Sequence, residues 1–449
     1  MTTGAKDFTR GAIFGPLVKL ALPIMTTNFV QMLYYLTDMA WIGRLGSEQV
    51  AAVGAVGMLM WMFSSFALFT KVAAEVSIGQ ALGASKNRVA KAFASHTTTL
   101  SLILSIVVAV FLFSSADFIL SFFKLSPYTQ AYAVEYLRIV AFSVPFSFLV
   151  LNFVGIYNGA GRSNIPMLLV CSGLALNIIL DPILIYGIPG FFVGMGIQGA
   201  AIATVIAQGV VFILLVYRLR RHDGILNKFP FFVRLRSGAT VRILQLGFPI
   251  AMMTLFFAII NSYLVRIASI YGGHLGVVAK TTGGQIEGIT WITAQGFSTA
   301  LGAFVAQNFA AGKMSRAWLA YRYTLGLMLA FGVLVTIAFL FAGEQIFGVI
   351  VPETAAAIAG GKFLFVAAFY QVFMMLELTT QGMFNGMGRT MPPAIVSIVF
   401  NLARIPMAYF FASWMGIEGV WWAIAISGII KGIILPMWLF ESRPKKAVA

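Results

Sequence analysis

The chain has 449 residues, of which 60% are hydrophobic and only 10% are charged, and its formal net charge is +16. A chain of this composition has too few polar residues to cover the surface of a water-soluble globular protein. The composition therefore excludes a water-soluble fold and indicates that lipid surrounds most of the protein. The single cysteine, Cys171, excludes a disulfide within the chain.

Apolar runs of 18 residues or more recur along the whole chain, and each is long enough to cross a hydrocarbon core of about 30 Å as a helix. We count twelve such runs. In chain order they cover residues 15–42, 50–78, 95–115, 132–156, 164–187, 195–217, 241–271, 276–307, 318–342, 358–382, 391–412 and 416–440.

The basic residues gather in the loops on one side of these predicted spans. With the N-terminus placed inside the cell, 21 of the 30 Lys and Arg residues fall in cytoplasmic segments, and seven of these lie within residues 218–242. An excess of basic residues in the cytoplasmic loops sets the orientation of a membrane protein. We therefore expect a multi-pass protein of the cell inner membrane with both termini in the cytoplasm, and no nucleic-acid partner.

The two halves of the chain are copies of each other. The segment YNGAGRS at residues 157–163 faces FNGMGRT at residues 384–390 with an offset of 227, and Pro23 faces Pro249 with an offset of 226. Matches at Gly, Pro, Asn and Arg are not expected when two apolar sequences are aligned by chance. Six helices per copy is an even number, so both copies enter the membrane from the same side. The predicted fold is an all-α membrane protein with twelve transmembrane helices in two parallel six-helix repeats.

This pattern predicts an N-terminal lobe at residues 1–217, a basic cytoplasmic linker at residues 218–240 and a C-terminal lobe at residues 241–449. Parallel repeats joined by a long loop are an architecture of secondary transporters. The GxxxxGK[ST] phosphate-binding motif does not occur, so an ATP-driven pump is not indicated. The three histidines are scattered and the cysteine is alone, which gives no zinc or haem site. We therefore expect neither an enzyme nor a cofactor other than a coupling ion.

Polar residues that occur in only one copy need a reason beyond duplication. Asp38, Asp181 and Thr204 lie near the outer ends of the first, fifth and sixth predicted helices. Their counterparts in the second copy are apolar: Leu264 or Val265 for Asp38, Ile405 for Asp181 and Ile424 for Thr204.

These three residues lie at one depth. Counted from the helix ends at about 1.5 Å per residue, each is about 7 to 12 Å below the outer surface. Tyr34 and Asn177 precede the two aspartates by one helical turn, so each can share the face of its aspartate. The spacing predicts one cluster of two carboxylates, an amide, a phenol and a hydroxyl.

A carboxylate within the membrane is costly and normally faces a cavity, a partner or an ion. Two carboxylates that lie close together cannot both stay charged in a dry site unless a cation lies between them. The cluster therefore predicts a coupling site for a proton or for Na⁺, the latter held by Asp38, Asn177, Asp181 and Thr204.

Several segments resemble the multidrug and toxic compound extrusion (MATE) family across essentially all twelve helices. They are LALPIMTTNFVQMLYYLTDMAWIGRLG, YNGAGRSNIP, FNGMGRTMPP, and NIILDPILIYG followed by GIQGAAIAT. The resemblance implies two six-helix lobes around a central cavity and the efflux of drugs or metabolites coupled to an ion gradient. The five residues Tyr34, Asp38, Asn177, Asp181 and Thr204 match the N-lobe cation and proton site of the bacterial and archaeal DNA-damage-inducible F-like members.

The sequence departs from those family members that carry a C-lobe sodium site. Such members have acidic residues in helices 7 and 10, whereas here helix 7 offers Asn261 and only helix 10 has an acid, Glu377. We therefore expect no C-lobe sodium site comparable to the N-lobe cluster.

Glu287 is a candidate substrate contact, because an acid within a lobe helix can attract a cationic drug. The alternative function is a lipid-linked saccharide flippase of a related fold, whose cavity needs bases to hold pyrophosphate; Lys71, Arg266, Lys280 and Arg404 favour this reading. A receptor or channel has no support beyond the helical composition. The expected protein is a monomeric antiporter that exports small, mostly cationic drugs or metabolites across the bilayer in exchange for H⁺ or Na⁺.

Overall fold

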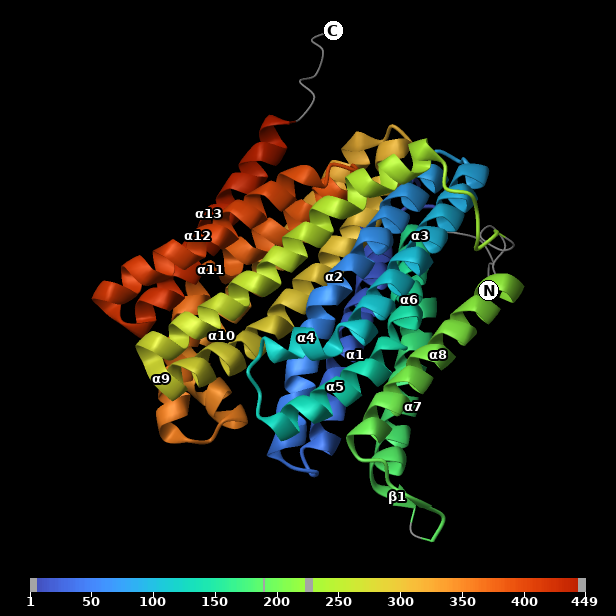
Figure 1. Cartoon of the computed structure of the whole chain (residues 1–449). Coiled ribbons are helices and arrows are strands. Elements are labelled where there is room, and N and C mark those ends of the chain that lie inside the picture. The colour runs from blue at the N-terminus through green and yellow to red at the C-terminus, as the bar shows by residue number, and fades with distance from the viewer. Residues whose placement is uncertain (1–5, 189, 223–228, 443–449) are drawn as a thin grey trace. The chain divides into compact units, whose positions relative to one another are not determined.

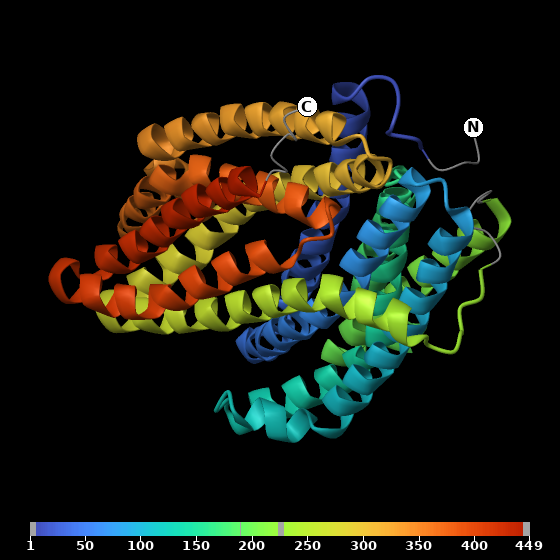
Figure 2. The ribbon, with the colours of Figure 1, turned by 90° about the horizontal axis from the view of Figure 1, so that it is seen from above.

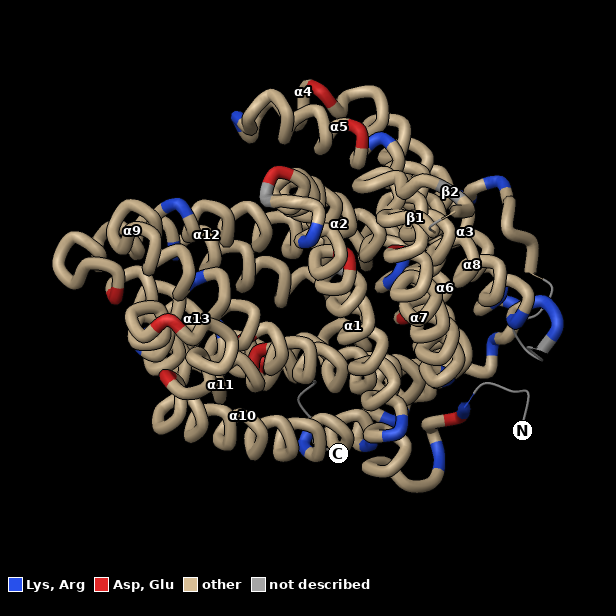
Figure 3. The backbone as a smooth tube through the Cα atoms, turned by 90° about the horizontal axis from the view of Figure 1, so that it is seen from below, with Lys and Arg blue, Asp and Glu red and all other residues tan. Residues whose placement is uncertain are grey.

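The computed structural model describes residues 6–188, 190–222 and 229–442, and almost all of these are helical. Helices satisfy every backbone hydrogen bond within one segment, which an apolar chain in lipid requires. Most of the helical chain carries no charged side chain (Figure 3). Part of the basic linker, residues 223–228, and the basic residues at 443–449 that entered the loop charge count lie outside the described residues.

Figure 1 shows the order of the elements along the chain. The first half comprises α1 (Phe14–Ile42), α2 (Ser47–Gly83), α3 (Asn87–Ser114), α4 (Ala116–Ser121), α5 (Pro127–Ala141), α6 (Val144–Gly159), α7 (Asn164–Tyr186), β1 (Gly187–Ile188), β2 (Phe192–Val193) and α8 (Ile197–His222). The second half comprises α9 (Ser237–Ala310), α10 (Met314–Ile350), α11 (Thr354–Gly386), α12 (Met391–Met415) and α13 (Ile417–Glu441). Strands β1 and β2 pair antiparallel at the end of α7 and α8, which lie side by side.

The predicted fold class is confirmed. Nine helices in the described part of the chain are long and apolar enough to cross a membrane, or ten if α5 and α6 together form one span. Dividing the 74-residue α9 at Gly273 and counting the 29-residue α1 gives the twelve predicted spans.

Two spans differ from a single straight helix. The predicted span 132–156 consists of α5 and α6, which meet at an angle of 51°. Pro145 lies in the first turn of α6, and its ring fixes φ and provides no N–H group, so α5 cannot continue through it. The predicted spans 241–271 and 276–307 run on as α9, and they are separated by Gly273, whose φ of 55° favours glycine.

The chain divides into two compact units. Unit 1 contains residues 1–7 and 26–251, and unit 2 contains residues 8–25 and 252–449. The boundaries therefore fall within α1 and within α9. The division at the basic linker, with lobes at residues 1–217 and 241–449, stays a prediction from the sequence.

The first turns of α9 pack in unit 1. Gly247 lies so close to the backbone of Phe69 on α2 that a Cβ atom there would collide with it. Arg242, also in the first turns of α9, donates a hydrogen bond of 3.3 Å to Gln80 Oε1 of α2.

The segment before α1 packs in unit 2 in a similar way. The Phe8 amide donates a hydrogen bond of 3.0 Å to Gln307 Oε1, and Lys313 Nζ donates one of 2.9 Å to the Thr9 carbonyl. Gln80 and Gln307 are 227 residues apart, so they occupy matching positions in the two copies. Each accepts a hydrogen bond from the beginning of one half of the chain: Gln307 from Phe8 and Gln80 from Arg242.

The closest helix contacts are also duplicated. In unit 1, Gly155 and Gly159 of α6 pack against the backbone of α2 at Lys71 and Glu75. In unit 2, Gly382 and Gly386 of α11 pack against the backbone of α9 at Ser298 and Gly302. All four glycines and the four residues they meet are related by the offset of 227, and glycines four residues apart allow helix backbones to approach closely in lipid. Helices α11 to α13 of unit 2 lie side by side in Figure 2.

Candidate functional site

The residues predicted to form the polar cluster come together in unit 1. Asp38 lies on α1, Asn177 and Asp181 lie on α7, and Thr204 lies on α8. The Thr204 hydroxyl donates a hydrogen bond of 3.2 Å to Asp38 Oδ2, and Asn177 Nδ2 donates one of 3.0 Å to Asp181 Oδ1. The two carboxyl groups lie within direct electrostatic range of each other.

This cluster is buried. Asn177 and Asp181 are 0% exposed, and Asp38 is 7% exposed. Close helix packing explains the burial at Tyr34: its hydroxyl lies where a Cβ atom of Gly173 on α7 would have to be. Glycine at position 173 thus leaves room for the end of the Tyr34 side chain against α7.

Four oxygen atoms of the cluster are buried without a hydrogen-bond partner: Asp38 Oδ1, Asp181 Oδ2, Asn177 Oδ1 and the Tyr34 hydroxyl. Within the described residues, neither aspartate forms a salt bridge. A buried polar atom without a partner costs about 1–3 kcal/mol, and more when the group is charged. Three of the four atoms can only accept, so a proton on a carboxyl group or a cation that prefers oxygen ligands would satisfy them.

Tyr136 of α5 belongs to this cluster and was missed by the sequence analysis. It is 5% exposed and is a polar neighbour of the Asp38 carboxylate. The comparison of the two halves contains the signal that could have found it. At the offset of 227 its counterpart is Phe363, so this hydroxyl too occurs in only one copy.

The buried acid Glu377 of unit 2 has different surroundings from Asp38 and Asp181. Glu377 of α11 forms a salt bridge of 3.0 Å with Lys431 of α13, and both side chains are at most 7% exposed. Glu377 also accepts hydrogen bonds of 3.1 Å from Gln381 and 3.0 Å from Ser397. The Glu377 carboxylate is therefore already neutralised by the ammonium group of Lys431. Asn261 does not join it; the Asn261 amide oxygen accepts a hydrogen bond of 3.5 Å from Lys280.

Glu287 lies on α9 among basic side chains and is half buried. It is within electrostatic range of Lys280, Arg404 and the Tyr370 hydroxyl. Within the described residues it forms no salt bridge with either base. The predicted substrate contact is thus part of a mixed-charge cluster rather than an isolated acid.

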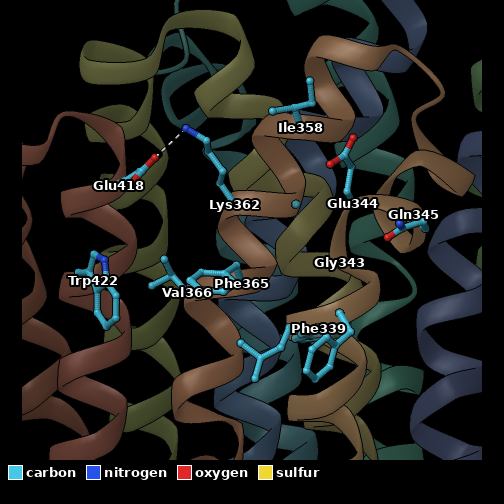
Figure 4. A pocket seen from close by; sticks show the side chains of 13 residues that line it. Phe339, Gly343, Glu344, Gln345, Ile358, Lys362, Phe365, Val366, Glu418 and Trp422 are labelled. Atoms are coloured by element: carbon cyan, nitrogen blue, oxygen red, sulfur yellow. Dashed lines mark hydrogen bonds and ion pairs between the residues drawn. The ribbon is translucent and has the colours of Figure 1, made fainter.

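A groove of about 430 Å³ lies on unit 2 between α10, α11 and α13 (Figure 4). Aromatic side chains such as Phe365 and Trp422 line it, together with a 2.9 Å salt bridge between Lys362 and Glu418. These two charged side chains are 60% and 40% exposed, and such a surface pair contributes little to the stability of the fold. The groove contains none of the residues of the predicted cluster.

Known proteins resemble this chain over almost its whole length. The family model MatE matches residues 23–183 and 249–410, so it matches once in each half. The probable multidrug resistance protein NorM of Thermotoga maritima is 26% identical over 442 residues, which cover 96% of this chain and 93% of that protein. An FAD transporter of Shewanella oneidensis is 24% identical over 436 residues, or 94% of each chain.

A solved structure has the same fold. It is described as the outward-facing conformation of a multidrug resistance MATE family transporter of the MOP superfamily, and it matches with a TM-score of 0.89 and 26% identity. The match covers 98% of this chain and 97% of that chain. Since the family model covers well over half of the sequence, the chain is a multi-pass membrane transporter and not an enzyme, and it belongs to the MATE family.

Proposed function

We propose that this protein is a secondary active multidrug exporter, which moves small cationic or amphipathic organic compounds out of the cell in exchange for H⁺ or Na⁺. The observation that carries the proposal is the cluster of buried carboxylate oxygens in unit 1, which have no counter-ion within the described part of the chain. Multidrug export is supported by the resemblance to a probable multidrug resistance protein and to a multidrug resistance transporter.

The coupling step follows from the geometry of Asp38 and Asp181. Both ionised carboxylates repel each other in a dry site, and one proton between them replaces this repulsion with a hydrogen bond. Asp38, Asn177, Asp181 and Thr204 are the oxygen donors that would hold Na⁺ in its place. Either ion supplies the positive charge that the cluster lacks.

Ion binding is coupled to a change in the helices that carry the donors. Asp38 is on α1, whereas Asn177, Asp181 and Thr204 are on α7 and α8, so the ion favours the state in which these three helices stay together. Loss of the ion leaves two like charges and weakens that packing. This difference is the bistable element on which alternating access of the two lobes would depend.

The proposed setting is the inner membrane, with a monomeric protein and both termini in the cytoplasm. The excess of basic residues in the loops assigned to the inside supports this orientation. Glu287 is the proposed contact for cationic compounds. The named relatives include transporters of drugs and of FAD, which favours small organic substrates over the alternative of lipid-linked saccharides.

Transport in proteoliposomes tests the proposal. The purified full chain is reconstituted with a cationic dye inside, and dye efflux is measured under an imposed proton gradient, an imposed sodium gradient and no gradient. We expect efflux to accelerate when one of the two gradients is present and to collapse when an ionophore dissipates it. Equal rates under all three conditions would contradict ion exchange.

A further inference from the structure

We infer that unit 2 contains a binding site for the anionic group of an amphipathic organic substrate, formed by Arg404, Lys280 and Tyr370. This inference rests on the proposed export function and extends its substrate range to compounds with a carboxylate or phosphate group. The three side chains come from α12, α9 and α11, and all of them are within electrostatic range of Glu287.

Arg404 has unused hydrogen-bonding capacity although it is only 6% exposed. Its Nε atom donates a hydrogen bond of 2.6 Å to Ser427 Oγ, which fixes the plane of the guanidinium group. Within the described residues this is its one hydrogen bond. A guanidinium group has five N–H donors, so the two terminal nitrogens remain available in the paired arrangement that suits a carboxylate or a phosphate.

Tyr370 places a second donor near this group. Its hydroxyl is buried and lies beside the Glu287 carboxylate without a direct hydrogen bond to it. Its ring packs against the backbone of Gly428, where an added Cβ atom would lie 3.0 Å from the ring. Because Gly428 follows Ser427 directly, the same turn of α13 positions both Tyr370 and Arg404.

Lys280 provides the second positive charge and is 9% exposed. Its ammonium group donates one long hydrogen bond of 3.5 Å to Asn261 and lies 5.6 Å from the centre of the Phe363 ring. An ammonium group has three donors, so these contacts leave capacity for a ligand.

The charges of the cluster do not balance. Lys431 and Glu377 neutralise each other in a direct salt bridge, which leaves Lys280 and Arg404 opposite the single acid Glu287. With Lys280 and Arg404 both protonated, one positive charge is therefore in excess at a buried position in a membrane protein. Such a charge is costly unless a partner neutralises it, and one monoanionic group supplies the missing charge. This balance favours an anionic group beside Arg404 and Lys280, while Glu287 stays the proposed contact for a cationic group.

Equilibrium binding of dansylglycine, a fluorescent carboxylate, tests the site against dansylamide, which has the same ring system without the charge. The probe is titrated into the full chain in nanodiscs of neutral lipid. Wild type should bind dansylglycine at least about tenfold more tightly than dansylamide, the scale expected for a buried charge pair. Arg404→Gln and Lys280→Gln should each abolish this preference. Arg266→Gln, which removes an exposed base from the part of α9 before Gly273, should preserve it.

Two outcomes would overturn the inference. One is equal affinity of wild type for both probes, or a preference that survives in both variants. The other concerns anionic lipid: a loss of dansylglycine affinity in anionic nanodiscs that disappears in Arg404→Gln would show that a lipid headgroup occupies the site. If Arg404→Gln does not fold, Arg404→Lys should fold and bind dansylglycine with reduced affinity, and unchanged affinity would contradict the role of the guanidinium group. Dye efflux by wild type under an ion gradient is measured separately, so a failure of exchange and a failure of this site are distinguishable.

Discussion

The buried acids Asp38 and Asp181 of unit 1 differ from Glu377 of unit 2 in what surrounds their oxygens. Asp38 and Asp181 retain oxygens without partners, whereas Glu377 receives hydrogen bonds from two neighbours and a salt bridge from Lys431. An acid that already holds a tethered ammonium group cannot exchange a mobile cation without first displacing it. At the scale of single residues, this difference supports the proposal that ion exchange takes place in unit 1.

The Glu377–Lys431 pair gives a prediction at this scale. Glu377→Gln leaves the Lys431 ammonium buried without a counter-charge, and removal of one partner from a buried pair costs about 3–5 kcal/mol. We expect a clearly lower unfolding temperature in detergent for Glu377→Gln, and recovery of part of the loss in the double variant Glu377→Gln/Lys431→Met. The protein that remains folded should keep most of its ion-coupled efflux. Loss of coupling in a fully folded Glu377→Gln variant would place the exchange site in unit 2 instead.

At the scale of helices, the sequence was informative wherever lipid imposes a simple rule. The spans could be predicted because a helix in a bilayer needs a long apolar run, and the repeat could be predicted because Gly, Pro and Gln recur at offsets of 226 or 227. The shared depth of Asp38, Asp181 and Thr204 followed from counting residues along helices. Contacts between residues that are far apart in the sequence could not be predicted by such counting.

The features that escaped prediction depend on how helices pack. The salt bridge between Glu377 and Lys431 joins residues 54 apart, and neither spacing nor periodicity indicates it. The position of Tyr136 beside Asp38 likewise depends on how α5 packs near α1. The bend between α5 and α6 could have been anticipated from Pro145, but its angle is set by the neighbouring helices.

The duplicated glycine contacts give a prediction at the scale of helices. Gly155→Ala places a Cβ atom against the Lys71 carbonyl, where backbone must move to make room. We expect a loss of about 1–3 kcal/mol, the usual cost of overpacking, seen as a lower unfolding temperature in detergent at a fixed scan rate. Gly54→Ala is the matched control, since nothing lies within 4 Å of its added Cβ atom. Equal unfolding temperatures for the two variants would show that α2 and α6 are not in close contact.

At the scale of the whole molecule, the charge pattern predicts the orientation in the membrane. In a Cys171→Ser background, a cysteine at the exposed Ser237, near the end of the basic linker, should react with an impermeant thiol reagent only from the cytoplasmic side. A cysteine at the exposed Ser121, near the opposite end of the spans, should react only from outside. Labelling of these two positions from the reverse sides would invert the proposed topology.

In the proposed mechanism, exchange of an ion at Asp38 and Asp181 drives transport by the whole protein. Asp38→Asn changes the volume of the side chain very little and retains an oxygen for the Thr204 hydroxyl, but it removes the negative charge and the site of protonation. The direct test is dye efflux from proteoliposomes that contain wild type or Asp38→Asn at equal protein density, under the gradient that drives the wild type. We expect Asp38→Asn to bind the dye but not to accelerate efflux when the gradient is imposed. Efflux by Asp38→Asn at the wild-type rate under the same gradient would contradict it.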